Sequence, residues 1–129
     1  MNHSILIVDD TDIIRALIKE ILESSGYDIL EASSGKDALD IMSTKKVDLA
    51  ITDIFMPEMS GIELAIKIKS NFPHIKILGI TAGGNNVTSN TAQKMFANHF
   101  EYILSKPIDH EELLDNVKYL LKSDSPHQK

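Results

Sequence analysis

The stretch ILIVDD, residues 5–10, places four consecutive aliphatic side chains directly before two aspartates. Strands covered by helices on both faces of a parallel sheet are apolar along their whole length, whereas half-exposed strands alternate apolar and polar residues. The stretch therefore predicts a fully buried strand over 4–9 that ends in acidic residues. A strand of this type is typical of a sheet enclosed between two layers of helices.

The same order, a short apolar strand and then a segment with helical spacing, recurs along the whole chain. Strands are predicted over five segments: 4–9, 27–32, 47–53, 75–81 and 102–105. Apolar side chains recur at helical spacing in five further segments: 13–22, 38–42, 62–68, 86–98 and 113–121. Ser34 is expected to cap the second helix, and Gly26 to end the first helix in the left-handed region.

Five strand–helix units with short connections predict an α/β fold, a doubly wound five-stranded parallel sheet with five helices. An eight-fold barrel would need roughly 250 residues, and the chain has 129. We therefore expect one domain over residues 1–123, followed by a polar C-terminal tail over residues 124–129.

Composition excludes several classes of function. The chain has 13 Lys and Arg against 19 Asp and Glu, a net charge of −6, which argues against a nucleic-acid or membrane partner. It has no cysteine, so a disulfide framework, a cysteine zinc site and a thiol nucleophile are all excluded. No apolar run approaches the roughly 18 residues of a membrane span, and the N-terminus does not resemble a signal peptide. A cytoplasmic protein is expected.

The chemically active residue types follow the predicted strands. Ligands of doubly wound sheets bind beyond the carboxyl ends of the strands, and this chain has these residues there: Asp9, Asp10, Asp53, Thr81 and Lys106. Three clustered carboxylates repel one another unless a cation joins them, and oxygen ligands alone select a hard ion such as Mg²⁺. A hydroxyl and an ammonium can bind phosphate oxygens. Each residue alone has an ordinary structural explanation, but their joint placement indicates phosphoryl transfer.

Four segments together resemble a known family: ILIVDD at 5–10, ITDIFMPEMSGIEL at 51–64, GITA at 79–82 and SKPI at 105–108. In order and spacing they are similar to the receiver domain of two-component response regulators, in particular the single-domain, chemotaxis-type members. The resemblance spans nearly the whole chain. It implies a flavodoxin-like fold with strand order 2-1-3-4-5.

The resemblance also implies roles for the residues at the strand ends. Asp53 would accept a phosphoryl group from a phosphohistidine on a sensor histidine kinase or a phosphotransfer protein. Mg²⁺ would be held by Asp10, Asp53 and the backbone carbonyl of Phe55, with Asp9 acting mainly through a coordinated water. Lys106 would contact a phosphoryl oxygen.

The remaining implied roles concern the response to phosphorylation. The Thr81 hydroxyl would bind another phosphoryl oxygen, Ala82 would let the backbone approach, and Lys106-Pro107 would be a cis peptide. Most members have an inward-swinging aromatic residue where this chain has Ile103, while the neighbouring Tyr102 should point the other way. The switch would alter the face made by the fourth helix, fifth strand and fifth helix, and so control an unnamed downstream protein. The chain would not be an enzyme beyond its own phosphorylation and dephosphorylation, and would be a monomer or weak homodimer.

Two other functions are compatible with parts of the pattern. Asp10-Thr11-Asp12 superficially fits the Asp-x-Asp motif of haloacid-dehalogenase-like phosphohydrolases, but nothing after Lys106 supplies the further acidic pair of that family. A flavin-binding module of the same architecture would have to place an anionic phosphate among acidic strand ends. Both alternatives are weaker than the receiver interpretation.

Overall fold

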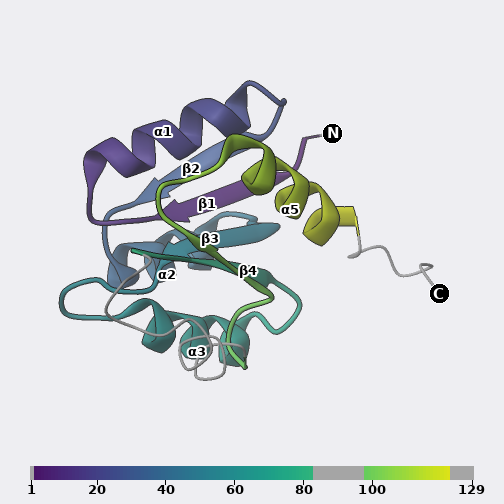
Figure 1. The fold of residues 1–129 in the computed structure, drawn as a ribbon. Helices are drawn as coiled ribbons and strands as arrows, with labels where there is room; N and C mark the ends of the chain where they lie inside the picture. The colour runs from purple at the N-terminus through teal and green to yellow at the C-terminus, as the bar shows by residue number, and fades with distance from the viewer. Residues whose placement is uncertain (1, 83–97, 123–129) are drawn as a thin grey trace.

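The computed structural model describes residues 2–82 and 98–122, and its centre is a parallel sheet of five strands in the order β2-β1-β3-β4-β5 (Figure 1). The strands are β1 (Ser4–Val8), β2 (Asp28–Ala32), β3 (Leu49–Asp53), β4 (Lys76–Thr81) and β5 (Tyr102–Ser105). The helices of the described residues are α1 (Asp12–Glu23), α2 (Gly35–Thr44), α3 (Gly61–Asn71) and α5 (His110–Lys122). The predicted fold class and strand order are confirmed.

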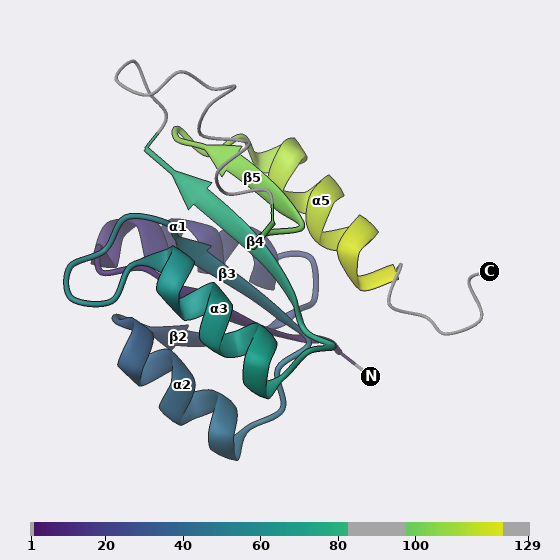
Figure 2. The ribbon, with the colours of Figure 1, turned by 90° about the horizontal axis from the view of Figure 1, so that it is seen from below.

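Helices cover both faces of the sheet. Figure 2 shows α2 and α3 on one face, with α1 and α5 on the other. Alternate residues of β1 divide between the two layers: Leu6 and Val8 pack with α2 and α3, while Ile5 and Ile7 pack with α1 and α5. Because both faces are covered, Ile5 to Val8 are all buried, as the uninterrupted apolar run predicts.

The observed strands are shorter than the predicted ones at several ends. Val47 and Ile75 are buried in the core, but β3 and β4 begin only at residues 49 and 76. Asp9 lies beyond β1, although its N–H still donates to the Ala32 carbonyl at 3.1 Å. An apolar run in the sequence indicates which residues are buried, not which residues pair with a neighbouring strand. The predicted strands are longer because buried residues continue past the paired ones.

Some predictions fall on parts of the chain that the structure does not describe. The fourth predicted helix, 86–98, lies outside the described residues except for its last residue, and the polar tail over 124–129 lies wholly outside them. None of the helices in 2–82 and 98–122 has the length and apolar content needed to cross a bilayer.

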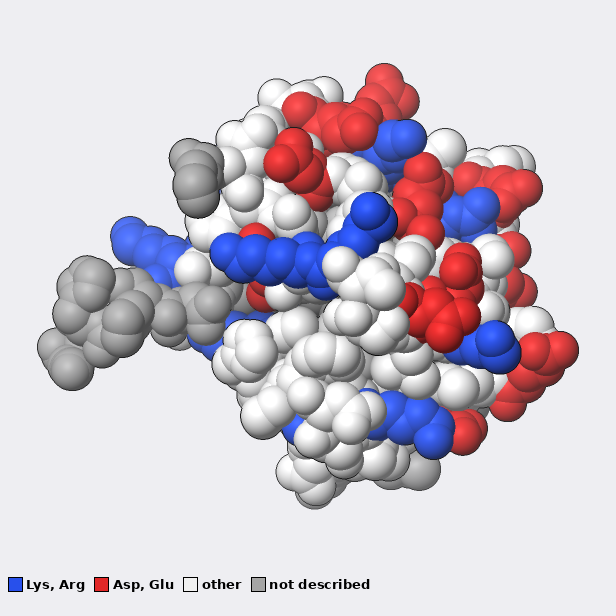
Figure 3. All heavy atoms as spheres, turned by 180° about the vertical axis from the view of Figure 1, so that it is seen from behind, with Lys and Arg blue, Asp and Glu red and all other residues white. Residues whose placement is uncertain are grey.

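Charged side chains of both signs are interspersed on the surface. Figure 3 shows the face opposite to that of Figure 1, where acidic side chains extend along the top and right and basic ones lie among them. Several neighbouring side chains of opposite charge form ion pairs, among them Lys19–Glu31, Lys36–Asp40 and Lys46–Asp48. Exposed pairs contribute little to stability individually, so burial of the two apolar layers is the main stabilising contribution.

The predicted cap of α2 at Ser34 and the predicted left-handed Gly26 after α1 are confirmed. The Ser34 hydroxyl accepts the Asp37 N–H at 3.1 Å at the start of α2, and Ser60 accepts the Glu63 N–H in the same way at α3. Gly26 has a φ of +94°, the left-handed conformation that ends the turn after α1.

Phe100 is part of the core rather than of a surface. Its side chain is buried against Gly79 of β4. A methyl group on Gly79 would lie 2.9 Å from the Phe100 ring, so the aromatic residue occupies the space above a glycine.

Two glycines occupy the same position in their helices but differ in what they touch. Gly35 and Gly61 each follow a serine cap, as the first residues of α2 and α3. A Cβ on Gly35 would lie 2.5 Å from the sulfur of Met59, the mobile part of a flexible side chain. A Cβ on Gly61 would collide with the Asp53 carbonyl oxygen and lie 2.7 Å from the Cα of Ile54.

We therefore expect Gly61→Ala to destabilise the protein by about 1–3 kcal/mol, because backbone atoms of the β3–α3 connection would have to move. Gly35→Ala is the matched control, and it should change the free energy of unfolding by less than about 1 kcal/mol, since alanine favours a helix and Met59 can rearrange. Urea unfolding followed by circular dichroism measures both. Equal effects at the two positions would contradict the assigned backbone contact.

Candidate functional site

The strand ends meet at one edge of the sheet because the parallel register aligns them. Val8 of β1 pairs with Thr52, and Asp53 at the end of β3 pairs with Ile80. Thr81 at the end of β4 pairs with Ser105, the last residue of β5. Residues directly after these strands therefore emerge beside one another, as the sequence predicts.

Three carboxylates form the centre of this edge. Asp9, Asp10 and Asp53 each have a carboxylate oxygen within 4.8 Å of the others. Asp9 and Asp53 are buried, with exposed fractions of 1% and 6%, whereas Asp10 is exposed. Buried like charges at this spacing require a cation, because low-dielectric surroundings do not screen their repulsion.

Lys106 supplies one positive charge. Its Nζ lies 3.6 Å from Oδ2 of Asp53 and 3.7 Å from Oδ2 of Asp9. The Lys106 N–H donates to the Thr81 carbonyl at 2.8 Å, which holds β5 beside β4 at the point where the side chain turns into the site. The expected cis peptide between Lys106 and Pro107 is present. One ammonium leaves three carboxylates with a net negative charge.

Asp9 fits a role as a cation ligand. Its Oδ1 accepts the Thr11 N–H at 2.8 Å, but its Oδ2 is buried without a hydrogen-bond partner among the described residues. A buried carboxylate oxygen in this condition has lost its solvation and gained only the ammonium 3.7 Å away. The all-oxygen ligand set suits a hard divalent ion. The residues present therefore fit Mg²⁺.

Asp53 is held by the backbone that follows it. The Phe55 N–H donates to its Oδ1 at 3.2 Å, and the Ile54 N–H donates to the Ile80 carbonyl at 2.8 Å. Burial raises the pKa of the Asp53 carboxyl above its ordinary value, Lys106 opposes that effect, and Asp9 reinforces it. The two oxygens are not equivalent, because Oδ1 faces the backbone while Oδ2 faces Lys106.

Other predicted residues lie around this centre. Thr81 is half-buried and Ala82 is exposed at the end of β4, and Phe55, two residues after Asp53, keeps 54% of its surface exposed. Ile103 pairs with Gly79 and packs partly buried on the α2–α3 side of the sheet. Tyr102 points the other way, as alternation along a strand predicts, and its hydroxyl donates to Glu112 of α5 at 3.1 Å.

Gly61 is a residue of this site that sequence reasoning missed. The packing of Gly61 against the Asp53 carbonyl is not predicted from the sequence. The Gly61 N–H also donates to the Ile54 carbonyl at 2.8 Å, closing the connection that follows Asp53. Only a glycine permits this approach, and a single sequence gives no signal for a contact of this kind.

Comparison with known proteins places this geometry in a family. The model of the response regulator receiver domain matches residues 5–118. Sporulation initiation phosphotransferase F of Bacillus subtilis is 36% identical over 122 residues, covering 94% of this chain and 95% of that protein. The transcriptional regulatory protein PhoP of the same organism is 33% identical over 122 residues, and the chain spans only about half of it, 50%.

Solved structures agree. The response regulator TrrA of Thermotoga maritima, in complex with Mg²⁺ and BeF, is 35% identical with a TM-score of 0.81, covering 92% of this chain and 98% of that one. A CheY-like receiver domain protein of Methanospirillum hungatei is 29% identical with a TM-score of 0.84, covering 96% and 97%. With the strand order, the acidic strand ends and the family match in agreement, this chain belongs to the response regulator receiver domains of two-component signal transduction.

Proposed function

We propose that this receiver domain accepts a phosphoryl group on Asp53 from a histidine kinase or a phosphotransfer protein, and that phosphorylation controls binding of a downstream protein. The observation that carries the proposal is the placement of Lys106 between the buried carboxylates of Asp9 and Asp53. The relative named as a phosphotransferase and the neighbour bound to Mg²⁺ and BeF support it.

Asp9, Asp10, Asp53 and the backbone carbonyl of Phe55 would hold Mg²⁺ in this site. The three carboxylate oxygens are close enough to share one ion. Oδ2 of Asp9, which makes no hydrogen bond to any described residue, offers the ion a buried ligand or an acceptor for a coordinated water. When bound, Mg²⁺ neutralises charge on the acceptor and on the incoming phosphoryl oxygens.

The Asp53 carboxylate is the nucleophile in this proposal. One of its oxygens bonds to phosphorus, the phosphorus–nitrogen bond to the donor imidazole breaks, and an acyl phosphate remains on Asp53. Lys106 then pairs with a phosphoryl oxygen, which offsets the charge that the new group brings to the acidic cluster. The fixed Phe55 N–H orients the carboxylate before the reaction.

The response to phosphorylation uses the ends of β4 and β5. Thr81 donates its hydroxyl to a phosphoryl oxygen, Ala82 lets the backbone approach, and Ile103 adjusts its packing beside them, with Pro107 fixing the turn after Lys106. The face that includes β5 and α5 then changes its fit to a protein partner. Ile103 is smaller than the usual aromatic, so this readout relies on aliphatic repacking.

The domain assignment follows the same proposal. Residues 1–123 form the receiver and 124–129 a polar tail, in a cytoplasmic protein that exists as a monomer or weak homodimer. It acts as a signalling module, catalysing only its own phosphorylation and dephosphorylation, without nucleic-acid or membrane partners. The family match over residues 5–118 favours this function over a haloacid-dehalogenase-like phosphohydrolase.

Incubation with Mg²⁺ and acetyl phosphate, followed by mass spectrometry, tests the acceptor. We expect one phosphoryl group on the peptide that contains Asp53, because this carboxylate lies beside Lys106 at the sheet edge. Omission of Mg²⁺ should abolish the modification. Asp53→Asn is the control and should remain unmodified. Phosphate on another residue of the wild-type protein would show that the acceptor is assigned wrongly.

Phe55 is expected to set the lifetime of the acyl phosphate. Its exposed ring stands two residues after the acceptor and can exclude water from the phosphoryl group. Phe55→Asn replaces the ring with an amide that can bind and orient water, so we expect a several-fold change in the dephosphorylation rate, with Phe55→Leu retaining a rate close to that of the wild type. Loss of labelled phosphate over time measures this rate. Identical rates for the Asn variant and the wild type would exclude a role for Phe55.

A further inference from the structure

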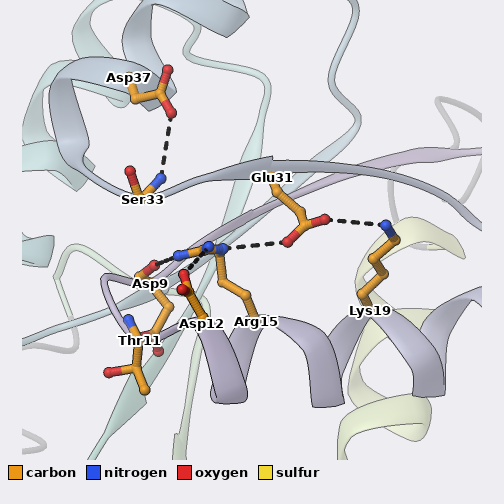
Figure 4. A network of polar contacts seen from close by, with 8 residues as sticks. All are labelled: Asp9, Thr11, Asp12, Arg15, Lys19, Glu31, Ser33 and Asp37. Carbon is orange, nitrogen blue, oxygen red and sulfur yellow. Dashed lines mark hydrogen bonds and ion pairs between the residues drawn. The ribbon is translucent and has the colours of Figure 1, made fainter.

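The guanidinium of Arg15 binds acceptors in three segments, one of which is the main chain of Asp9 in the acidic cluster. It lies in the first turns of α1, with only 14% of its side chain exposed. Its Nη1 donates to the carbonyl of Asp9 at 2.6 Å, its Nη2 donates to Asp12, and its Nε donates to Glu31 of β2 at 3.3 Å. Figure 4 shows Arg15 between these partners, with Lys19 on the far side of Glu31.

Three of the four polar atoms of Asp9 make hydrogen bonds, and Arg15 binds one of them. The Asp9 N–H donates to the Ala32 carbonyl at 3.1 Å, and its Oδ1 accepts the Thr11 N–H at 2.8 Å. Its carbonyl oxygen accepts a hydrogen bond from Arg15, so within the part of the chain that the structure describes only Oδ2 has no hydrogen bond. These three bonds fix the backbone and the side-chain rotation of Asp9 together, so Oδ2 faces Asp53 and Lys106.

Arg15 stabilises the turn that carries two carboxylates of the proposed cation site, so this inference rests on the proposed function. The turn between β1 and α1 carries Asp9 and Asp10, and α1 begins at Asp12 with Thr11 making no side-chain cap. Without a cap, the turn depends on other contacts for its conformation, and the Arg15 bond crosses it from the helix to the end of the strand. We propose that Arg15 is a positioning residue for the cation site, which holds the Asp9–Asp10 turn so that both carboxylates converge on Mg²⁺.

The direction in which Mg²⁺ affinity changes when Arg15 is replaced distinguishes a positioning role from a purely electrostatic one. A guanidinium near the carboxylates repels Mg²⁺, so loss of its charge alone would strengthen Mg²⁺ binding. If Arg15 acts through geometry, its loss weakens binding, because the ligands are no longer held together. Residues that orient metal ligands from behind commonly contribute about 10–100-fold in metal affinity.

The test is a Mg²⁺ titration of the full chain, followed by amide NMR shifts, in the absence of phosphodonor. For Arg15→Gln we expect affinity for Mg²⁺ to fall about tenfold. Arg15→Lys keeps the charge, but one ammonium cannot span three acceptors on three elements, so its affinity should lie between that of Arg15→Gln and the wild type. Lys19→Gln is the matched control, since Lys19 pairs with the same Glu31 at 3.1 Å without touching Asp9. It should stay within about twofold of the wild type.

A second measurement separates positioning from a general loss of structure. In autophosphorylation with acetyl phosphate, Arg15→Gln should raise the Mg²⁺ concentration for half-maximal rate while saturating Mg²⁺ restores most of the maximal rate. If Arg15→Gln does not fold, Arg15→Lys carries the test, and wild-type affinity in that variant overturns the proposal. Affinity of Arg15→Gln equal to or above that of the wild type also overturns it, as does an equal loss in Lys19→Gln.

The outcomes distinguish this inference from the function on which it rests. A wild-type protein that binds no Mg²⁺ and accepts no phosphoryl group would overturn both. Normal phosphorylation of the wild type, together with unchanged Mg²⁺ affinity in the Arg15 variants, would overturn only the role of Arg15.

Discussion

The repulsion among three carboxylates at one sheet edge is the constraint on which the site depends. Asp9 and Asp53 are buried, so their mutual repulsion is poorly screened, and Lys106 alone does not balance them. In the proposed function, this surplus of negative charge would attract Mg²⁺, and the bound cation would make an anionic phosphoryl donor tolerable. The imbalance that costs folding stability would then be what allows metal and phosphate to bind together.

The fold keeps that charge in place through backbone contacts more than through side-chain bonds. Parallel pairing brings Asp53, Thr81 and Lys106 to the same edge of the sheet. The hydrogen bond from the Lys106 N–H to the Thr81 carbonyl holds the end of β5 against β4. Gly61 lies against the Asp53 carbonyl. On the other side, Arg15 binds the carbonyl of Asp9. Asp9 and Asp53 are therefore anchored at their main chains, and Oδ2 of each carboxylate faces Lys106.

The fold could be predicted well from sequence because both signals behind it are local. Apolar runs identify buried strands and helical spacing identifies amphipathic helices, so the order of elements, Ser34 as a cap and Gly26 as a left-handed residue were all predicted correctly. The positions of the strand ends were predicted less accurately. Val47 and Ile75 are buried without pairing in the sheet, because the core extends beyond the hydrogen-bonded ladder.

The sequence by itself determined which residue types stand at the strand ends, since parallel strands must bring their carboxyl ends to one edge. Only the tertiary structure decided that Lys106 lies between Asp9 and Asp53, that Oδ2 of Asp9 has no hydrogen-bond partner among residues 2–82 and 98–122, and that Phe100 is part of the core. These outcomes depend on side-chain rotamers and on close approach between residues far apart in the chain. Periodicity carries no information about such contacts, because they arise only once the layers have packed.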